Sequence, residues 1–193
     1  MAGSTRERLL EAGLELLLEH GYNDLGIQAL LSRAEVPRGS FYHHFASKEA
    51  FALAVVDRYM QEVHEGLDLC LADRDRAPLQ RVRRFFELSR EKYAREGYLG
   101  CLLGGLGQEL SGVSKVFRQR IDGCLNAIAE RLEGCFVEAR ERGELPPDAD
   151  PRRLANLLLD CWEGAALRCR LRRDPAPLTE VLDFYFSAAT GGG

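Results

Sequence analysis

Residues 21–51 read GYNDLGIQALLSRAEVPRGSFYHHFASKEAF, and the succession of helices that this stretch predicts decides the fold. The apolar residues within 27–31 have the spacing of one face of a short helix. Pro37 marks the turn after it, because proline cannot supply the backbone N–H of a continuing helix. A very short helix then follows through residues 38–45, and Ser47 is a typical N-cap for a long helix. The stretch therefore predicts a short helix, a turn, a second short helix and a long helix.

The second half of this stretch is locally basic. Residues 36–48 contain arginine, histidine and lysine but no acidic residue, although the whole chain has a formal net charge of −4. Such a strip suits the phosphates of a DNA duplex. Gly39 lets the backbone approach closely, and Arg38 can make a forked contact to guanine in a major groove. We expect Phe41 and Phe45, four residues apart, to be buried against the first helix. The predicted DNA contacts are Arg38, Gly39, Ser40, Tyr42, His43, His44 and Lys48.

The stretch resembles the DNA-binding segment of the TetR family of transcriptional repressors. The matching positions are Gly21, Tyr22, Ala34, Val36, Arg38, Gly39, Ser40, Phe41, Tyr42, His44, Phe45, Ser47, Lys48 and Glu49. Leu25-Gly26 stands where that family usually has Thr or Ser, and Glu35 and Pro37 stand where it commonly has Gly and Ser. The resemblance implies a helix-turn-helix domain that binds a palindromic operator in double-stranded DNA.

The rest of the chain continues the helical pattern. Leucines within 9–18 recur every three or four residues, and the pattern stops at His20-Gly21, a typical helix end. Further helices are predicted at 78–95, 113–142, 151–172 and 176–188, and no alternating β pattern competes with them. The predicted fold class is all-α. Residues 1–47 form an N-terminal three-helix DNA-binding domain with a helix-turn-helix, and residues 48–190 form a larger helical bundle for ligand sensing and dimerisation.

The composition favours a globular protein with reduced thiols. Hydrophobic residues make up 46% and charged residues 29% of the chain, so disorder is not expected. No stretch approaches the roughly 18 apolar residues of a membrane helix. We expect a cytoplasmic protein without a membrane partner. The six cysteines include no Cys-x-x-Cys pair, which favours free thiols over a zinc site. The terminal glycines 191–193 are expected to be a frayed tail.

Two C-terminal helices carry apolar stripes that predict a homodimer. A protein that reads a two-fold operator needs two recognition helices about 34–36 Å apart. Two helices from each subunit would form a four-helix interface. The residues assigned to this interface are Leu154, Leu158, Cys161, Ala165, Leu178, Leu182 and Tyr185. The alternative is that the same stripes form an ordinary core within one subunit.

Cys101 lies among glycines in the stretch EGYLGCLLGGLGQELSG, residues 96–112. Gly100 before it favours a helix start, where unpaired backbone N–H groups stabilise a thiolate and lower the pKa of a cysteine. Arg168 or Arg170 would add to this stabilisation. The surroundings of Cys101 and the stretch GAALRCRLRRDPAPLTEVL resemble the branch of the family that contains the N-ethylmaleimide reductase repressor.

That second resemblance implies a sensor for electrophiles or oxidants at the cysteine that matches Cys101. The predicted sensor or effector residues are Cys101, Trp162, Arg170 and His64. The alternative is a reversible, non-covalent effector beside a cysteine that only packs. In either case, the expected partners are operator DNA, a small molecule and a second copy of the chain.

Two other classes of function compete with regulation. A cysteine-dependent enzyme would use Cys101 as nucleophile and a histidine as base, but three of the four histidines lie in the DNA-binding segment, which leaves His64. A metal-responsive switch would combine His64, Cys101 and a carboxylate, but no ligand spacing requires it. We therefore expect no catalytic residue, no metal ion and no cofactor.

Overall fold

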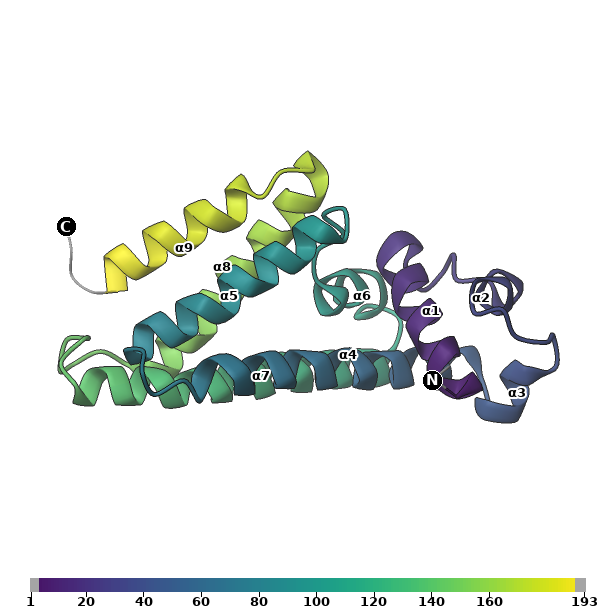
Figure 1. The fold of residues 1–193 in the computed structure, drawn as a ribbon, viewed down its shortest axis with the longest axis horizontal. Coiled ribbons are helices and arrows are strands. Elements are labelled where there is room, and N and C mark those ends of the chain that lie inside the picture. Colours follow the sequence, from purple (N-terminus) through teal and green to yellow (C-terminus); the bar gives the residue numbers. More distant parts are fainter. Residues whose placement is uncertain (1–3, 190–193) are drawn as a thin grey trace. The chain divides into compact units, whose positions relative to one another are not determined.

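The computed structural model describes residues 4–189, and this part of the chain consists of helices joined by turns, without a strand (Figure 1). The helices are α1 (Thr5–His20), α2 (Ile27–Arg33), α3 (Ser40–His44), α4 (Lys48–Leu71), α5 (Pro78–Arg95), α6 (Leu102–Leu110), α7 (Lys115–Glu141), α8 (Pro151–Arg172) and α9 (Ala176–Ala189). The predicted all-α class is confirmed. Between residues 4 and 189, none of the helices combines the length and apolar character that a membrane span requires. The predicted frayed tail lies outside the described residues.

Local signals set the helix ends. α1 begins with a capping box, in which the Glu7 N–H donates to Ser4 Oγ and the Ser4 N–H donates to the Glu7 carboxylate. It ends at Gly21, whose φ of +80° favours glycine. α4 begins after Ser47, whose hydroxyl accepts the N–H of Ala50. These helix ends agree with the sequence pattern. For α6, the sequence pattern predicted where the helix begins but not where it ends.

The described chain forms two compact units, and the first contains residues 4–62 and 102–121. It holds α1, α2, α3, α6, the first part of α4 and the first turns of α7. The leucine stripe of α1 faces α2 and α3, so Leu9, Leu30 and Phe41 are fully buried. The predicted burial of Phe41 and Phe45 is confirmed.

The second unit contains residues 63–101 and 122–189. In it, α8 and α9 form a hairpin, and α5 packs against α9 (Figure 1). The Arg81 side chain is only 1% exposed, donates to the Leu71 carbonyl at the end of α4 and pairs with Glu138 of α7 at 2.6 Å. This buried arginine therefore joins three helices of the unit. The functional division predicted between residues 47 and 48 stays a prediction.

Candidate DNA-binding surface and sensor site

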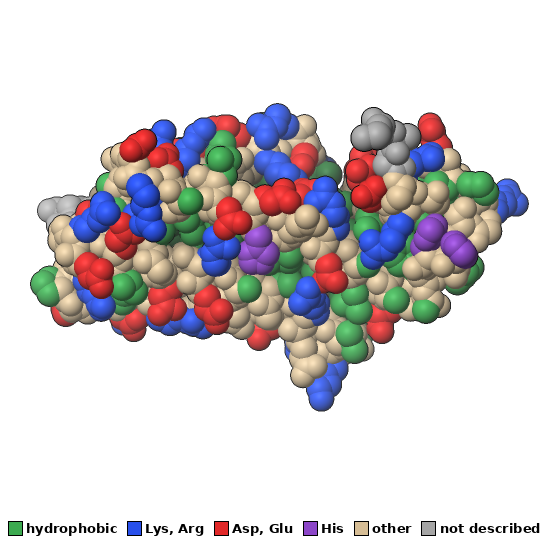
Figure 2. Space-filling view, turned by 60° about the horizontal axis from the view of Figure 1, so that its bottom comes forward, with side chains coloured by type: hydrophobic (Ala, Val, Ile, Leu, Met, Phe, Trp, Pro, Cys, Tyr) green, Lys and Arg blue, Asp and Glu red, His purple; other side chains and the backbone are tan. Residues whose placement is uncertain are grey.

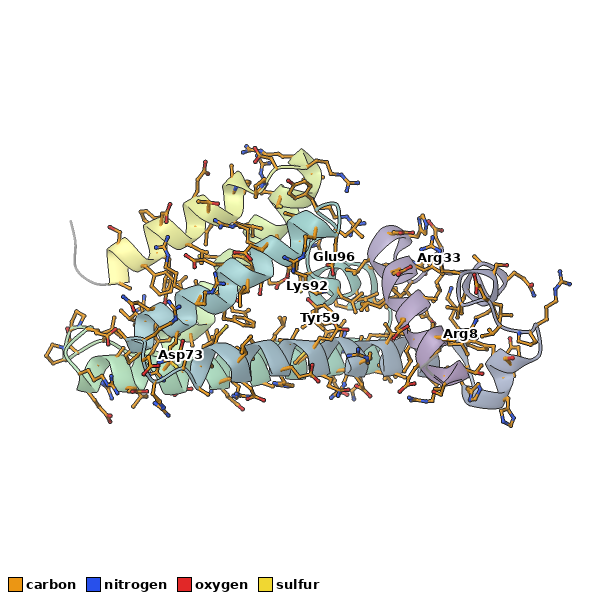
Figure 3. The ribbon with its side chains drawn as sticks, in the orientation of Figure 1. Arg8, Arg33, Tyr59, Asp73, Lys92 and Glu96 are labelled. Atoms are coloured by element: carbon orange, nitrogen blue, oxygen red, sulfur yellow. The ribbon has the colours of Figure 1, made fainter. Side chains whose placement is uncertain are left out.

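An arginine from α1 holds the turn between α2 and α3. Glu35 in this turn has a φ of +53°, a left-handed conformation that a side chain disfavours. The Nη2 atom of Arg8 lies 2.6 Å from the carbonyl oxygens of both Ala34 and Glu35, and Arg8 is labelled in Figure 3. The Val36 N–H donates to the Leu31 carbonyl at 3.1 Å. The helix-turn-helix therefore forms although glutamate stands where the resembled family commonly has glycine.

Aromatic packing determines which face of α3 is exposed. The ring of Phe41 lies 5.7 Å from that of Phe45, and these two rings lie 5.4 and 4.9 Å from the ring of Phe51 on α4. Phe41 is fully buried, whereas the next residue, Tyr42, is 72% exposed. Because α3 has only five residues, this cluster fixes its rotation about the helix axis. The polar residues of α3 consequently point outward.

The residues predicted to contact DNA all lie outside the core. The exposed ones are Arg38, Gly39, Tyr42 and His43, and the half-buried ones are Ser40, His44 and Lys48. The rings of His43 and His44 are 5.0 Å apart, and Figure 2 shows a pair of histidine side chains at the surface with Lys or Arg side chains nearby. The Lys48 ammonium lies 3.2 Å from the Asn23 carbonyl oxygen and 4.7 Å from the centre of the Tyr22 ring. The basic strip is thus accessible, and its individual DNA contacts stay predictions.

A carboxylate on α6 holds the loop that follows α1. The two oxygens of Glu109 accept the backbone N–H groups of Tyr22 and Asn23 at 2.8 and 2.7 Å. A Cβ atom at Gly21 would lie 2.7 Å from the same carboxylate, and the φ of +80° at this position also disfavours a side chain. Nothing in the sequence indicated this contact, since the two segments lie far apart along the chain.

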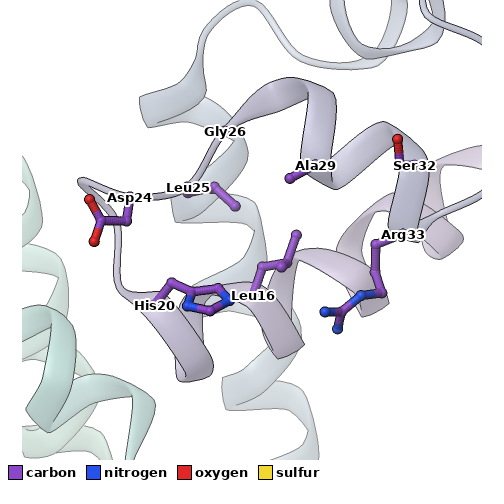
Figure 4. A pocket seen from close by; sticks show the side chains of 8 residues that line it. All are labelled: Leu16, His20, Asp24, Leu25, Gly26, Ala29, Ser32 and Arg33. Atoms are coloured by element: carbon purple, nitrogen blue, oxygen red, sulfur yellow. The ribbon is translucent and has the colours of Figure 1, made fainter.

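A surface hollow of about 480 Å³ lies between α1 and α2 (Figure 4). Its lining residues are Leu16, His20, Asp24, Leu25, Gly26, Ala29, Ser32 and Arg33. Gly26 occupies the N-cap position of α2, and no side chain caps the helix there. If residue 26 carried a Cβ atom, that atom would have no neighbour within 4 Å, so the surroundings leave room for a side chain there. The departure at Leu25-Gly26 therefore leaves α2 without a capping hydroxyl.

The loop before Cys101 has an unusual backbone that α8 stabilises. Gly97, Tyr98 and Gly100 have φ values of +74°, +61° and +80°. The Leu99 carbonyl accepts a hydrogen bond from Arg170 on α8 at 3.2 Å. A Cβ atom at Gly100 would lie 3.4 Å from the backbone carbonyl oxygen of Ala166, also on α8. The loop therefore lies directly on α8, and Cys101 follows it immediately before α6.

This close approach places Cys101 beside a glutamate of α8. The half-buried Cys101 thiol donates a hydrogen bond to the carboxyl group of Glu163, which is half-buried too. The pKa of Glu163 is raised to about 7, mainly by burial and also by the negative charge of Asp160, whereas the hydrogen bond from Cys101 acts in the opposite direction. The sequence pattern did not indicate that Glu163 would lie beside Cys101. All six cysteines are free thiols.

The other predicted sensor residues lie at different places in the second unit. Trp162 is buried, and its ring lies 4.8 Å from that of Phe86 and 6.0 Å from that of Tyr93. His64 is half-buried on α4, and its Nδ1 atom is buried without a hydrogen-bond partner within the described chain. Arg168 is exposed on α8. Within residues 4–189, no three His, Cys, Asp or Glu side chains form a group that could hold a metal ion.

Most residues assigned to the dimer interface are buried inside the single chain, and their role in an interface stays a prediction. Leu158, Ala165, Leu178, Leu182 and Tyr185 are buried, Leu154 is half-buried and only Cys161 is exposed. The physical reason is that α8 and α9 pack on each other through these stripes, and the Tyr185 hydroxyl donates to the Leu154 carbonyl at 2.7 Å. The apolar residues exposed on the two helices are Leu157, Leu167, Leu171 and Phe184.

Two known protein families match this chain, one in its N-terminal part and one in its C-terminal part. The family described as bacterial regulatory proteins, tetR family, matches residues 9–55. The family described as tetracyclin repressor-like, C-terminal domain, matches residues 78–185.

Individual relatives and structures agree with these matches. The transcriptional regulator AcuR of Cereibacter sphaeroides is 41% identical over 92% of this chain and 81% of AcuR, and the repressor NemR of Escherichia coli K12 is 32% identical over 92% of this chain and 90% of NemR. A regulatory protein TetR from Rhodobacter sphaeroides superposes with a TM-score of 0.91 at 39% identity, covering 95% of this chain and 98% of that one. The reduced form of E. coli NemR superposes with a TM-score of 0.85 at 32% identity, covering 95% of both chains. The chain belongs to the TetR family of transcriptional regulators, and its resemblance to the branch that contains NemR is confirmed.

Proposed function

We propose that this regulator is a cytoplasmic, homodimeric repressor that binds a palindromic operator through α3 and the turn before it. The observation that carries the proposal is the orientation of α3, whose aromatic cluster is buried while Arg38, Tyr42 and His43 are exposed. The Arg38 guanidinium would contact guanine in the major groove, and the Lys48 ammonium would neutralise a phosphate.

Substitutions in the strip test the DNA-binding role. Arg38→Ala should weaken specific binding by about 1–3 kcal/mol and relax the base preference, because it removes a base contact. Lys48→Ala should weaken binding to all sequences alike and lower the slope of log affinity against log salt by about one. Fluorescence anisotropy with a labelled duplex measures both, and Arg153→Ala in the second unit is a control with the same loss of charge. Wild-type affinity and salt dependence in both strip variants would contradict the proposal.

We infer that the two subunits associate through the outer faces of α8 and α9. Leu171 and Phe184 are 69% and 77% exposed in the single chain, and Leu157 and Leu167 add to the apolar surface. Gly164 and Phe184 line a hollow of about 390 Å³ between these helices, which suits a side chain from another subunit. Covering these apolar side chains in a four-helix interface would remove them from water.

We also infer that a thiol-reactive electrophile or oxidant, or a small effector, acts on the second unit and releases the operator. Cys101 is half-buried, ends the loop held by α8 and directly precedes α6. α6 in turn carries Glu109, which holds the loop after α1. An adduct on Cys101 that displaces the start of α6 would therefore disturb a contact of the DNA-binding segment.

A reversible ligand is the second candidate, and the aromatic cluster of Phe86, Tyr93 and Trp162 supports it. Such rings provide apolar contacts to small molecules without any covalent step. Cys101→Ser separates the two candidates. The variant should lose its response to electrophiles but keep DNA binding if the cysteine is the sensor, and should respond normally if the ligand binds reversibly.

A further inference from the structure

The first residue of α4, Lys48, contacts the loop that joins α1 to α2. Its ammonium donates to the Asn23 carbonyl oxygen at 3.2 Å and lies 4.7 Å from the centre of the Tyr22 ring, whose face attracts a cation. An ammonium carries three N–H donors, and the Asn23 carbonyl accepts only one of them. Lys48 can therefore hold this position and still bind a phosphate.

Two other helices of the first unit fix this loop. The Glu109 carboxylate on α6 accepts the N–H groups of Tyr22 and Asn23 at 2.8 and 2.7 Å. The ring of Phe117 on α7, which is only 1% exposed, meets the Tyr22 ring edge to face with 5.3 Å between the ring centres. The carbonyl oxygen and the aromatic ring that Lys48 contacts thus belong to a segment that is held through both its backbone and its side chain.

Fixing a lysine side chain in advance favours its contact with DNA. The ammonium of lysine sits on a flexible four-carbon stem, and ordering that stem on binding costs conformational entropy. A side chain that is already held in the bound position loses less of this freedom. A phosphate contact held in place also fixes the register and orientation of a protein on the duplex. Residues 22–23 can therefore raise the affinity for DNA through Lys48 without touching the duplex themselves.

We propose that Tyr22 and Glu109 position the Lys48 ammonium for contact with a phosphate of the operator backbone. The Tyr22 ring and the Asn23 carbonyl hold the ammonium, and Glu109 holds the backbone of both residues. The role rests on the proposed function, in which Lys48 neutralises a phosphate. A carboxylate close to DNA repels phosphates, so loss of the Glu109 charge would strengthen binding if charge alone acted, whereas loss of positioning weakens it.

Variants of Tyr22 test the proposal by fluorescence anisotropy with two labelled duplexes, one from the DNA upstream of the protein's own gene and one of scrambled sequence. Tyr22→Leu removes the aromatic face and should weaken binding to both duplexes about two- to fivefold, the ordinary effect of one exposed cation–π contact. Tyr22→Phe keeps the ring and should bind like the wild type. The loss in Tyr22→Leu should disappear in a Lys48→Ala background, because no ammonium is then left to position. Circular dichroism confirms that each variant is folded.

Glu109→Gln tests the support of the loop in the same assay. The amide keeps a single carbonyl acceptor, so one of the two backbone N–H groups loses its partner. Binding to both duplexes should fall about twofold or more, and this loss should also disappear in the Lys48→Ala background. Glu141→Gln, at an exposed position of the second unit, removes the same charge and should bind like the wild type. A Glu109→Gln protein that binds as tightly as Glu141→Gln, or more tightly, would overturn the proposal.

The Lys48→Ala variant separates this proposal from the proposed function. If Lys48→Ala binds both duplexes like the wild type at every salt concentration, the phosphate contact assigned to Lys48 is refuted, and the positioning role fails with it. If Lys48→Ala weakens binding but Tyr22→Leu causes the same loss with and without Lys48, the phosphate contact stands and the positioning role is overturned. A loss in Tyr22→Leu that requires Lys48, together with normal binding by Tyr22→Phe, supports the proposal.

Discussion

Replacing Glu35 by glycine should stabilise the helix-turn-helix. The backbone of Glu35 has a φ of +53°, and a residue with a side chain pays about 1–2 kcal/mol in this region. Glycine removes that strain but also gains freedom in the unfolded chain, which opposes the effect by about 0.5–1 kcal/mol. The Glu35 carboxylate lies 3.9 Å from Arg8 and is 87% exposed, so its ion pair contributes little. The net increase in the free energy of unfolding should be about 0.5–1 kcal/mol.

Urea denaturation followed by circular dichroism measures this difference, and thermal unfolding should shift by about 1–4 °C. Glu35→Ala is the matched control, because it removes the same carboxylate but keeps a Cβ atom in the left-handed conformation. Its stability should stay close to that of the wild type. If the glycine variant were no more stable than the alanine variant, the strain assigned to this turn would be refuted.

Three further outcomes follow from the structure. Arg8→Met should lower the free energy of unfolding by about 1–2 kcal/mol in the same urea assay, since it leaves two carbonyl oxygens of the turn without their donor. Leu171→Glu should raise the dimer dissociation constant in analytical ultracentrifugation at least about tenfold, because a charge would enter the proposed apolar interface. Glu163 has a pKa raised to about 7, so its ionisation destabilises the folded protein as pH rises from about 4.5 to 7. Glu163→Gln should therefore match the wild type in stability near pH 4.5 and exceed it by about 1–3 kcal/mol at pH 8, and equal stability at both pH values would contradict the burial of this carboxyl group.

The first four helices could be predicted from the sequence because their signals are local. Gly21 ends α1 through its positive φ, Ser47 caps α4 through its own hydroxyl, and Phe41 and Phe45, four residues apart, are both buried at α3. Each of these features acts within a few residues of chain. The unusual residue in the turn, Glu35, was recognised as a departure from the family, but its conformation and its support by Arg8 required the structure.

Helical spacing alone does not distinguish the two apolar faces of α8. α8 carries two apolar faces, one with Leu158 and Ala165 and the other with Leu157 and Leu171. Spacing identifies both faces but does not tell which one packs on α9 and which remains exposed. In the single chain the first face is buried and the second is exposed, and the residues of the dimer interface stay a prediction.

The sequence also could not predict that the carboxylates of Glu109 and Glu163 contact the two candidate sites. Glu109 contacts backbone N–H groups 87 and 86 residues earlier, and Glu163 accepts the thiol proton of a cysteine from a distant loop. A single acidic residue on an amphipathic helix carries no pattern that distinguishes such a role from a solvated one. Gly21 and Gly100, beside these contacts, both have a φ of +80°, which favours glycine for the turn itself and does not indicate either carboxylate.

The most direct test of the account is the affinity for the DNA upstream of the protein's own gene, before and after modification of Cys101. Fluorescence anisotropy at fixed salt should show binding of the wild-type protein and a loss of affinity of at least about fivefold after alkylation, the lower limit of ordinary coupling between two sites. Cys101→Ser should bind the same duplex with unchanged affinity before and after treatment. Unchanged binding by the fully alkylated wild type would contradict the sensor role of Cys101, and a protein that binds no operator duplex in either state would contradict the DNA-binding role assigned to α3.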